Sequence, residues 1–175
     1  FTRNRGVLTA EEQAKLLESK AAVIGCGGLG GQVTALLARF GLGALILCDR
    51  DSFEESNLNR QLFSRESNLG RNKAEAGGEE ISSLASHIDI TVWAQEATAA
   101  NMPVIIGASA LVLDLLDGLA HQPALEHPAP ATGTPLVHRP RPGAPAVARL
   151  TPLPAPVSAP LSAAPPTYAH REHAQ

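Results

Sequence analysis

Hydrophobic positions along the chain alternate between short apolar runs and longer stretches with helical spacing. The apolar runs have the length of buried strands and cover 21–24, 44–48, 88–93 and 110–113. The stretches with helical spacing cover 10–19, 32–40 and 71–86. Strands separated by helices predict right-handed crossover connections and a mostly parallel sheet. The pattern therefore predicts an α/β domain with a doubly wound sheet.

Local signals set the ends of the predicted helices. Thr9 is a candidate N-cap for the first helix, with Glu12 three residues later. Gly41 ends the second helix. Gly77 and Gly78 weaken the third helix by about 1 kcal/mol each relative to alanine.

The composition narrows the class of protein. The 175 residues are 44% hydrophobic and 18% charged, which indicates one folded domain and not a disordered chain. The net charge of −3 and the lack of a long Lys/Arg run make nucleic acid and membrane surfaces unexpected partners. Cys26 and Cys48 are too few for a four-cysteine zinc site, and we expect no zinc. Two cysteines in apolar runs favour a reducing cytoplasm.

Proline divides the chain into two parts. Thirteen of the 14 prolines lie from Pro123 onward, and residues 138–175 hold nine of them with a single acidic group. Proline removes a backbone donor and fixes φ, so this spacing excludes a regular helix or an inner strand. We expect a folded region over 1–137 and a disordered or extended Pro/Ala-rich tail over 138–175.

A glycine-rich turn carries the first chemical signal. Gly25, Gly27 and Gly30 form G-x-G-x-x-G between the first predicted strand and a helix. Such a turn lets backbone N–H groups approach a phosphate at the positive end of the helix. Asp49 ends the second strand, where a carboxylate can bind ribose hydroxyls. The motif predicts a nucleotide site that would serve NAD as well as ATP. It is not a P-loop, because the sequence contains no G-x-x-x-x-G-K-[ST].

The stretch after Asp49 favours a triphosphate. Arg60 and Lys73 can offset phosphate charge, and Asn57 can donate to a phosphate oxygen. Asp117, after a later strand, can hold Mg²⁺ that bridges the phosphates. An NAD-dependent dehydrogenase would need a catalytic second half, which the Pro-rich tail cannot supply.

Four separated motifs together resemble the ThiF/MoeB/HesA family, the bacterial relatives of the ubiquitin-activating enzymes. In chain order they are G-x-G-G-L-G at 25–30, D-x-D-x-x-x-x-S-N-L-N-R-Q at 49–61, G-x-x-K at 70–73, and Asp117 after an apolar strand. The segment that begins at Arg3 is similar to the amino-terminal arm of that family. The resemblance covers about residues 1–137 and implies a Rossmann-like, ThiF-type fold.

The resemblance also implies a nucleotide site residue by residue. Gly28 would lie against the adenylate of ATP, and Asp49 would bind its ribose. The stretch from Ser56 through Asn57 to Arg60 would line the phosphates.

The resemblance further implies an adenylyltransferase. Arg60 and Lys73 would stabilise charge on the phosphates, Asp117 would coordinate Mg²⁺, and Arg3 would reach the ATP site of a partner subunit in a homodimer. The reaction would be attack by a carboxylate on the α-phosphate of ATP, giving an acyl adenylate and pyrophosphate. The expected carboxylate is the terminal glycine of a ubiquitin-like sulfur-carrier protein for molybdopterin or thiamine, and a tRNA carboxylate and a peptide terminus stay open as alternatives.

Departures from the family pattern follow Asp117. Gly118 stands where the family usually has Asn, and Gln122 and Pro123 stand near a usual Arg. The resemblance stops after His138, so we expect a truncated chain whose tail is either an out-of-frame continuation or a genuine Pro-rich extension. Three readings stay open: an adenylyltransferase domain, an NAD-binding module, and a family member without activity.

Overall fold

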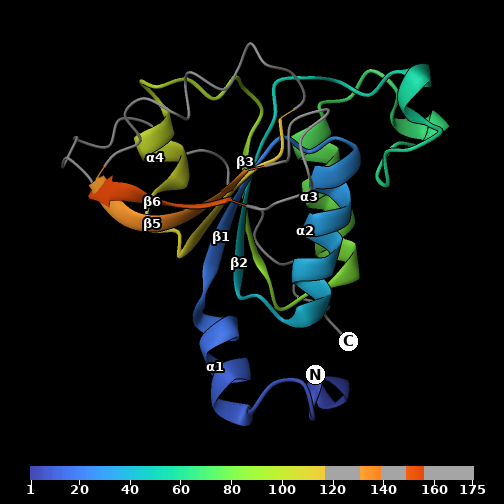
Figure 1. Cartoon of the computed structure of the whole chain (residues 1–175). Helices are drawn as coiled ribbons and strands as arrows, with labels where there is room; N and C mark the ends of the chain where they lie inside the picture. The colour runs from blue at the N-terminus through green and yellow to red at the C-terminus, as the bar shows by residue number, and fades with distance from the viewer. Residues whose placement is uncertain (117–130, 139–148, 156–175) are drawn as a thin grey trace, which may run out of the picture.

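The computed structural model describes residues 1–116, 131–138 and 149–155. The described part is a six-stranded sheet flanked by helices (Figure 1). Its strands are β1 (Lys20–Ile24), β2 (Ala44–Cys48), β3 (Asp89–Trp93), β4 (Leu111–Asp114), β5 (Ala131–His138) and β6 (Arg149–Ala155). Its α-helices are α1 (Ala10–Glu18), α2 (Gly28–Phe40), α3 (Lys73–Leu84) and α4 (Met102–Ile106). None of the helices in these ranges is long and apolar enough to cross a membrane.

The strand order places a topological switch in the middle of the sheet. The order is β3-β2-β1-β4-β5-β6, and every pair is parallel except β5 with β6. The chain runs outward from β1 to β3 and then crosses back to lay β4 on the other side of β1. In open α/β sheets, ligands bind at such a point, outside the carboxyl ends of the strands. The predicted doubly wound, mostly parallel sheet is confirmed.

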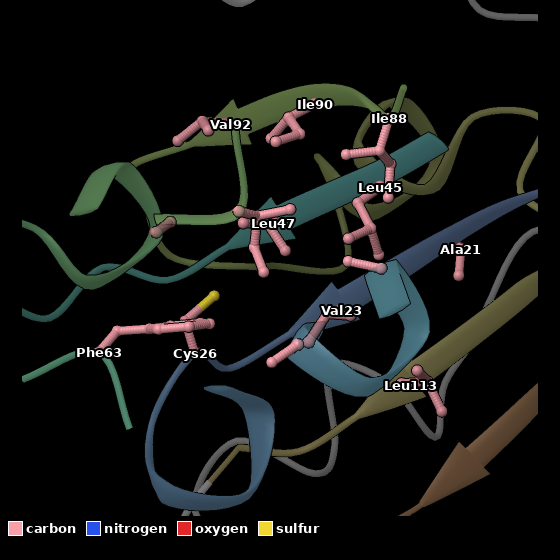
Figure 2. Packing of buried hydrophobic residues seen from close by; sticks show 14 of the residues in the cluster. Ala21, Val23, Cys26, Leu45, Leu47, Phe63, Ile88, Ile90, Val92 and Leu113 are labelled. Atoms are coloured by element: carbon pink, nitrogen blue, oxygen red, sulfur yellow. The ribbon is translucent and has the colours of Figure 1, made fainter. Parts of the chain in front are cut away.

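Two hydrophobic clusters hold the helices on opposite faces of the sheet. Successive residues of β1 point to opposite faces, so Val23 belongs to one cluster and Ile24 to the other. The first cluster joins β1, β2 and β3 to α2 and α3, as Figure 2 shows for Val23, Leu45, Leu47 and Ile90. The second packs α4 against the other face (Figure 1). Burying one such aliphatic side chain stabilises the fold by about 1.5–3 kcal/mol.

Helix ends follow the local signals in the sequence. Thr9 caps α1 through a complete capping box, in which its hydroxyl accepts from the Glu12 N–H and the Glu12 carboxylate accepts from the Thr9 N–H. Asn72 caps α3, accepting from the N–H groups of Ala74 and Glu75. The glycines that weaken α3 have a packing reason, since a Cβ at Gly78 would lie 2.9 Å from Val92 Cγ2 on β3. A larger residue there would push the helix off the sheet.

Some elements differ from the sequence-based expectations. Helix α2 begins at Gly28 rather than Gln32, so the glycine cluster forms its first turn. The short helix α4 was not predicted, because five residues are too few for a periodic signal. Within the tail expected to be disordered or extended, Arg149–Ala155 form strand β6 at the edge of the sheet, a strand that was not predicted. The antiparallel edge position allows its prolines, because an edge strand leaves one row of backbone groups unpaired. The rest of the tail lies outside the described residues.

Candidate nucleotide site

A cavity of about 400 Å³ opens at the carboxyl ends of β1 and β2. Its walls come from five segments that are distant in sequence: the start of α2, the loop after β2, the start of α3, the loop after β3, and the residues after β4. This is the switch point that the strand order creates, and the volume is in the range of small-molecule sites.

The glycine-rich turn forms the floor of the cavity and requires its glycines for two separate reasons. Gly25 has a φ of +96°, and a Cβ there would lie 2.8 Å from the backbone carbon of Leu115. A Cβ on Gly30 would lie 1.8 Å from the Gly25 carbonyl oxygen, so α2 can start this close to β1 only without a side chain. Gly27 and Gly28 meet nothing closer than 3.8 Å and face the cavity. Their backbone is therefore free to approach a ligand at the positive end of α2.

Asp49 lies at the end of β2, 6% exposed, and fastens the glycine turn to the neighbouring strand. Its Oδ2 accepts a hydrogen bond from the Cys26 N–H at 2.7 Å, and its Oδ1 accepts from the Asp51 N–H at 2.9 Å. Burial raises the pKa of the Asp49 carboxyl, while these backbone donors and the Lys73 ammonium act to lower it. The carboxylate is thus held in place before any ligand arrives.

Lys73 is the buried cation of the site. It begins α3, its side chain is only 10% exposed, and its Nζ lies 3.5 Å from Asp51 Oδ2. A backbone hydrogen bond of 2.9 Å from the Lys73 N–H to the Asp51 carbonyl fixes the two residues together. Asp51 was not predicted as a site residue, although the D-x-D spacing with Asp49 placed it on the same loop.

The Ser56–Arg60 segment lies along one side of the cavity, but its residues have different roles there. Asn57 is buried, and its Oδ1 accepts from the Glu54 N–H at 3.1 Å, so this amide shapes the loop. Arg60 is exposed at the rim, where its Nη1 donates to the Ser56 carbonyl at 2.6 Å and to Asn59 Oδ1 at 3.0 Å. Asn57 and Arg60 line the cavity, whereas Ser56 does not.

Of the two remaining predicted site residues, the structure places one, Arg3, away from the cavity. Asp117 lies outside the described residues. Arg3 belongs to a short 3₁₀ helix (Thr2–Asn4) at the other end of the domain, where Asn4 Nδ2 donates to the Phe40 carbonyl at the end of α2. The N-terminus and α1 lie at that lower end in Figure 1, opposite the carboxyl ends of the strands.

Other residues join the cavity without having been predicted. Gln61 contributes a side chain next to Gly27, and its only signal was its place at the end of the 49–61 motif. The segment Gln95–Ala97 joins from the end of β3 and carries no motif. Arg50 and Glu96 form an ion pair of 2.9 Å across this rim. Only the parallel sheet brings these segments beside Asp49.

The two cysteines are poor candidates for chemistry. Both are buried and free. Burial and the neighbouring Asp49 raise the pKa of the Cys48 thiol to about 12, and burial likewise raises the pKa of Cys26 well above its usual value. Thiols with raised pKa values carry little thiolate and react slowly.

Comparison with known proteins gives the same family as the motifs. Residues 1–140 match the model of the ThiF family. The sulfur carrier protein ThiS adenylyltransferase of Escherichia coli (strain K12) is 31% identical over 130 residues, which are 74% of this chain and 52% of that protein. The adenylyltransferase and sulfurtransferase MOCS3 of Dictyostelium discoideum is 37% identical over 125 residues, 71% of this chain and 29% of that protein.

A solved structure also has a fold similar to that of this chain. The E. coli tRNA N6-threonylcarbamoyladenosine dehydratase TcdA, in complex with ATP, superimposes with a TM-score of 0.73 at 26% identity, covering 81% of this chain and 58% of TcdA. The chain thus spans about half the length of the E. coli relatives that it matches. Because the family model matches most of its residues, the chain belongs to the ThiF family.

Proposed function

We propose that this chain is the nucleotide-binding part of an ATP-dependent adenylyltransferase that activates a carboxylate. The observation that carries the proposal is the convergence of Asp49, Lys73 and Arg60 around the open backbone of Gly27 and Gly28. An anionic phosphate chain would find two cations and a helix N-terminus there, and a ribose would find a carboxylate. The relatives named as adenylyltransferases support the same assignment.

Asp49 would bind the ribose without giving up its structural role. An ionised carboxylate offers about four acceptor positions on its two oxygens. Two are used by the N–H groups of Cys26 and Asp51, which leaves room for two ribose hydroxyls. The same side chain would then join the nucleotide to the glycine turn, so ligand binding would stiffen the floor of the cavity.

Lys73 and Arg60 would act on the phosphates by charge. In the step proposed, a carboxylate oxygen forms a bond to the α-phosphorus while the bond to the bridging oxygen of the β-phosphate breaks and pyrophosphate leaves. Lys73, held by Asp51, is positioned before binding, whereas Arg60 donates to its own loop among the described residues and can turn inward. Preorganised charge of this kind lowers the barrier without a side-chain nucleophile.

A magnesium ion stays a proposal. Within the described ranges, no group of three or more His, Cys, Asp or Glu could hold a metal ion. Magnesium that accompanies a nucleotide is commonly held by one or two carboxylates together with the phosphates, so such a group is not required. Asp117 would be the protein ligand, and the ion would neutralise phosphate charge when bound.

The acceptor that we propose is the C-terminal carboxylate of a ubiquitin-like sulfur-carrier protein. The names of two relatives support this class, the E. coli ThiS adenylyltransferase and the SAMP-activating enzyme E1 of Haloferax volcanii. TcdA is named for a modified tRNA nucleoside, which keeps a tRNA carboxylate as the second candidate. The free state of Cys26 and Cys48 supports a reducing compartment such as the cytoplasm.

We further propose a homodimer in which Arg3 completes the site of the partner subunit. The cavity lies at the start of α2, and the arm that carries Arg3 is tied to Phe40 at the end of α2. Helix α2 has 13 residues, so its two ends are about 20 Å apart at 1.5 Å per residue. Arg3 therefore starts about a helix length away from the cavity of its own chain, which favours action across a subunit boundary.

Ligand-dependent melting separates the candidate functions. A ligand that binds only the native state raises the melting temperature with its concentration. We expect ATP to stabilise the chain and NAD at the same concentration to leave it unchanged. Stabilisation by NAD alone would favour an NAD-binding module. ATP binding without ATP–pyrophosphate exchange, in the presence of a sulfur carrier, would indicate a family member that binds nucleotide but is not active.

A further inference from the structure

Gln61 occupies an unusual position beside the start of α2. It is buried, with 9% of its surface exposed, and it lines the cavity. Its Nε2, Cδ and Oε1 lie 3.8, 3.9 and 4.0 Å from the point where a Cβ of Gly27 would stand. The three nearly equal distances mean that the amide lies flat against the glycine turn. Its backbone is fixed by the hydrogen bond from the Gln61 N–H to the Asn57 carbonyl at 2.9 Å.

The side-chain oxygen of Gln61 is buried without a hydrogen-bond partner in the described part of the chain. A buried polar atom left unpaired is costly, and most such atoms in folded proteins have a protein or water partner. The amide therefore has bonding capacity that the protein does not use. The Nε2 atom is not among the enclosed atoms and donates no hydrogen bond to the described residues, so its hydrogens stay available at the wall of the cavity.

The positive charges around Gln61 favour an anion as its hydrogen-bond partner. The first N–H groups of α2 have no partners within the helix, and α2 carries no acidic residue in its first turn. Lys73 and Arg60 line the same cavity. A neutral amide beside this helix start can donate a hydrogen bond to a phosphate oxygen without adding a further charge.

We propose that Gln61 is a phosphate-binding residue, whose Nε2 donates to a phosphate oxygen of a nucleotide held over Gly27 and Gly28. The proposal rests on the ATP site proposed above but not on the adenylation step. In this role Gln61 contributes to the affinity for a nucleotide that carries phosphates and not to the affinity for the bare nucleoside. A residue that merely supported the turn would affect ATP and adenosine alike.

Calorimetric titration with ATP, adenosine and inorganic pyrophosphate tests the proposal. Q61E retains the shape but replaces the donor by an acceptor, and measurement at pH 8 favours its ionised form because burial raises a carboxyl pKa. Q61M removes the hydrogen-bonding group at similar volume without adding charge. The matched control is Q32E, the same substitution at an exposed position of α2 that does not line the cavity.

We expect Q61E to weaken ATP and pyrophosphate binding at least about tenfold and Q61M to weaken it less, because hydrogen bonds to charged groups are among the stronger ones. Adenosine affinity should change less than about threefold in both variants, and Q32E should resemble the wild type. Equal losses for ATP and adenosine, or no loss for ATP, would overturn the role of Gln61. A wild-type chain that binds no ATP would overturn the site as well, whereas ATP binding without pyrophosphate exchange would overturn only the proposed reaction.

Discussion

Replacing Asp49 by alanine probes the link between the fold and the candidate site. The substitution leaves two backbone donors without their acceptor, the N–H groups of Cys26 and Asp51. Cys26 is 2% exposed, so its N–H has no ready access to water, and leaving it unpaired costs about 1–3 kcal/mol. Asp51 is exposed, so water can replace the lost acceptor, and the loss there is about 0.5–1.5 kcal/mol. We expect Asp49→Ala to lower the free energy of unfolding by about 1.5–4.5 kcal/mol.

The same substitution should weaken ATP binding by about 1–3 kcal/mol, because ribose hydroxyls would lose their buried acceptor. Urea unfolding measures the first effect, and calorimetric titration measures the second below the unfolding transition. Asp89→Ala is the matched control, since Asp89 is an exposed aspartate at the start of β3 and its change should stay within about 0.5 kcal/mol. Unchanged stability in Asp49→Ala would refute the hydrogen-bonding argument, and unchanged ATP affinity would refute the ribose role.

Three further predictions concern charge and assembly. Arg60→Ala and Lys73→Ala should slow ATP–pyrophosphate exchange more than they weaken ATP binding. By analogy with the loss of an oxyanion donor, each should raise the activation free energy by about 2.7–4 kcal/mol, and equal losses in exchange and binding would indicate ordinary ground-state contacts. Mixing Arg3→Ala subunits with Asp117→Ala subunits should restore part of the exchange activity through the one intact composite site, and absence of recovery would place each site within one chain. Burial raises the pKa of Asp49 in the folded state above its unfolded value. The protonated side chain therefore contributes to the free energy of unfolding at low pH, and this contribution is lost as the pH rises through the folded-state pKa. The stability of the wild type relative to Asp49→Asn should therefore fall as pH rises from about 4 toward neutrality, and a difference that is flat or rises with pH would contradict the raised pKa.

The sequence by itself determined the parts of this protein that depend on neighbours along the chain. The capping box of Thr9, the strand-turn-helix around Gly25 and the place of Asp49 at the end of β2 follow from local rules of backbone geometry and hydrogen bonding. The alternation of strands and helices also predicts the doubly wound topology, because parallel strands need crossover connections.

Only the tertiary structure decided how the cavity is completed. The placement of Gln61 against Gly27, the ion pair of Lys73 with Asp51 and the arrival of Gln95–Ala97 all join segments that no local pattern relates. The position of β6 at the edge of the sheet is of the same kind, because proline is acceptable there and not in an inner strand. The physical reason is that the parallel sheet brings the carboxyl ends of distant strands to one edge, where the chemistry of each residue is set by partners that lie far away in sequence.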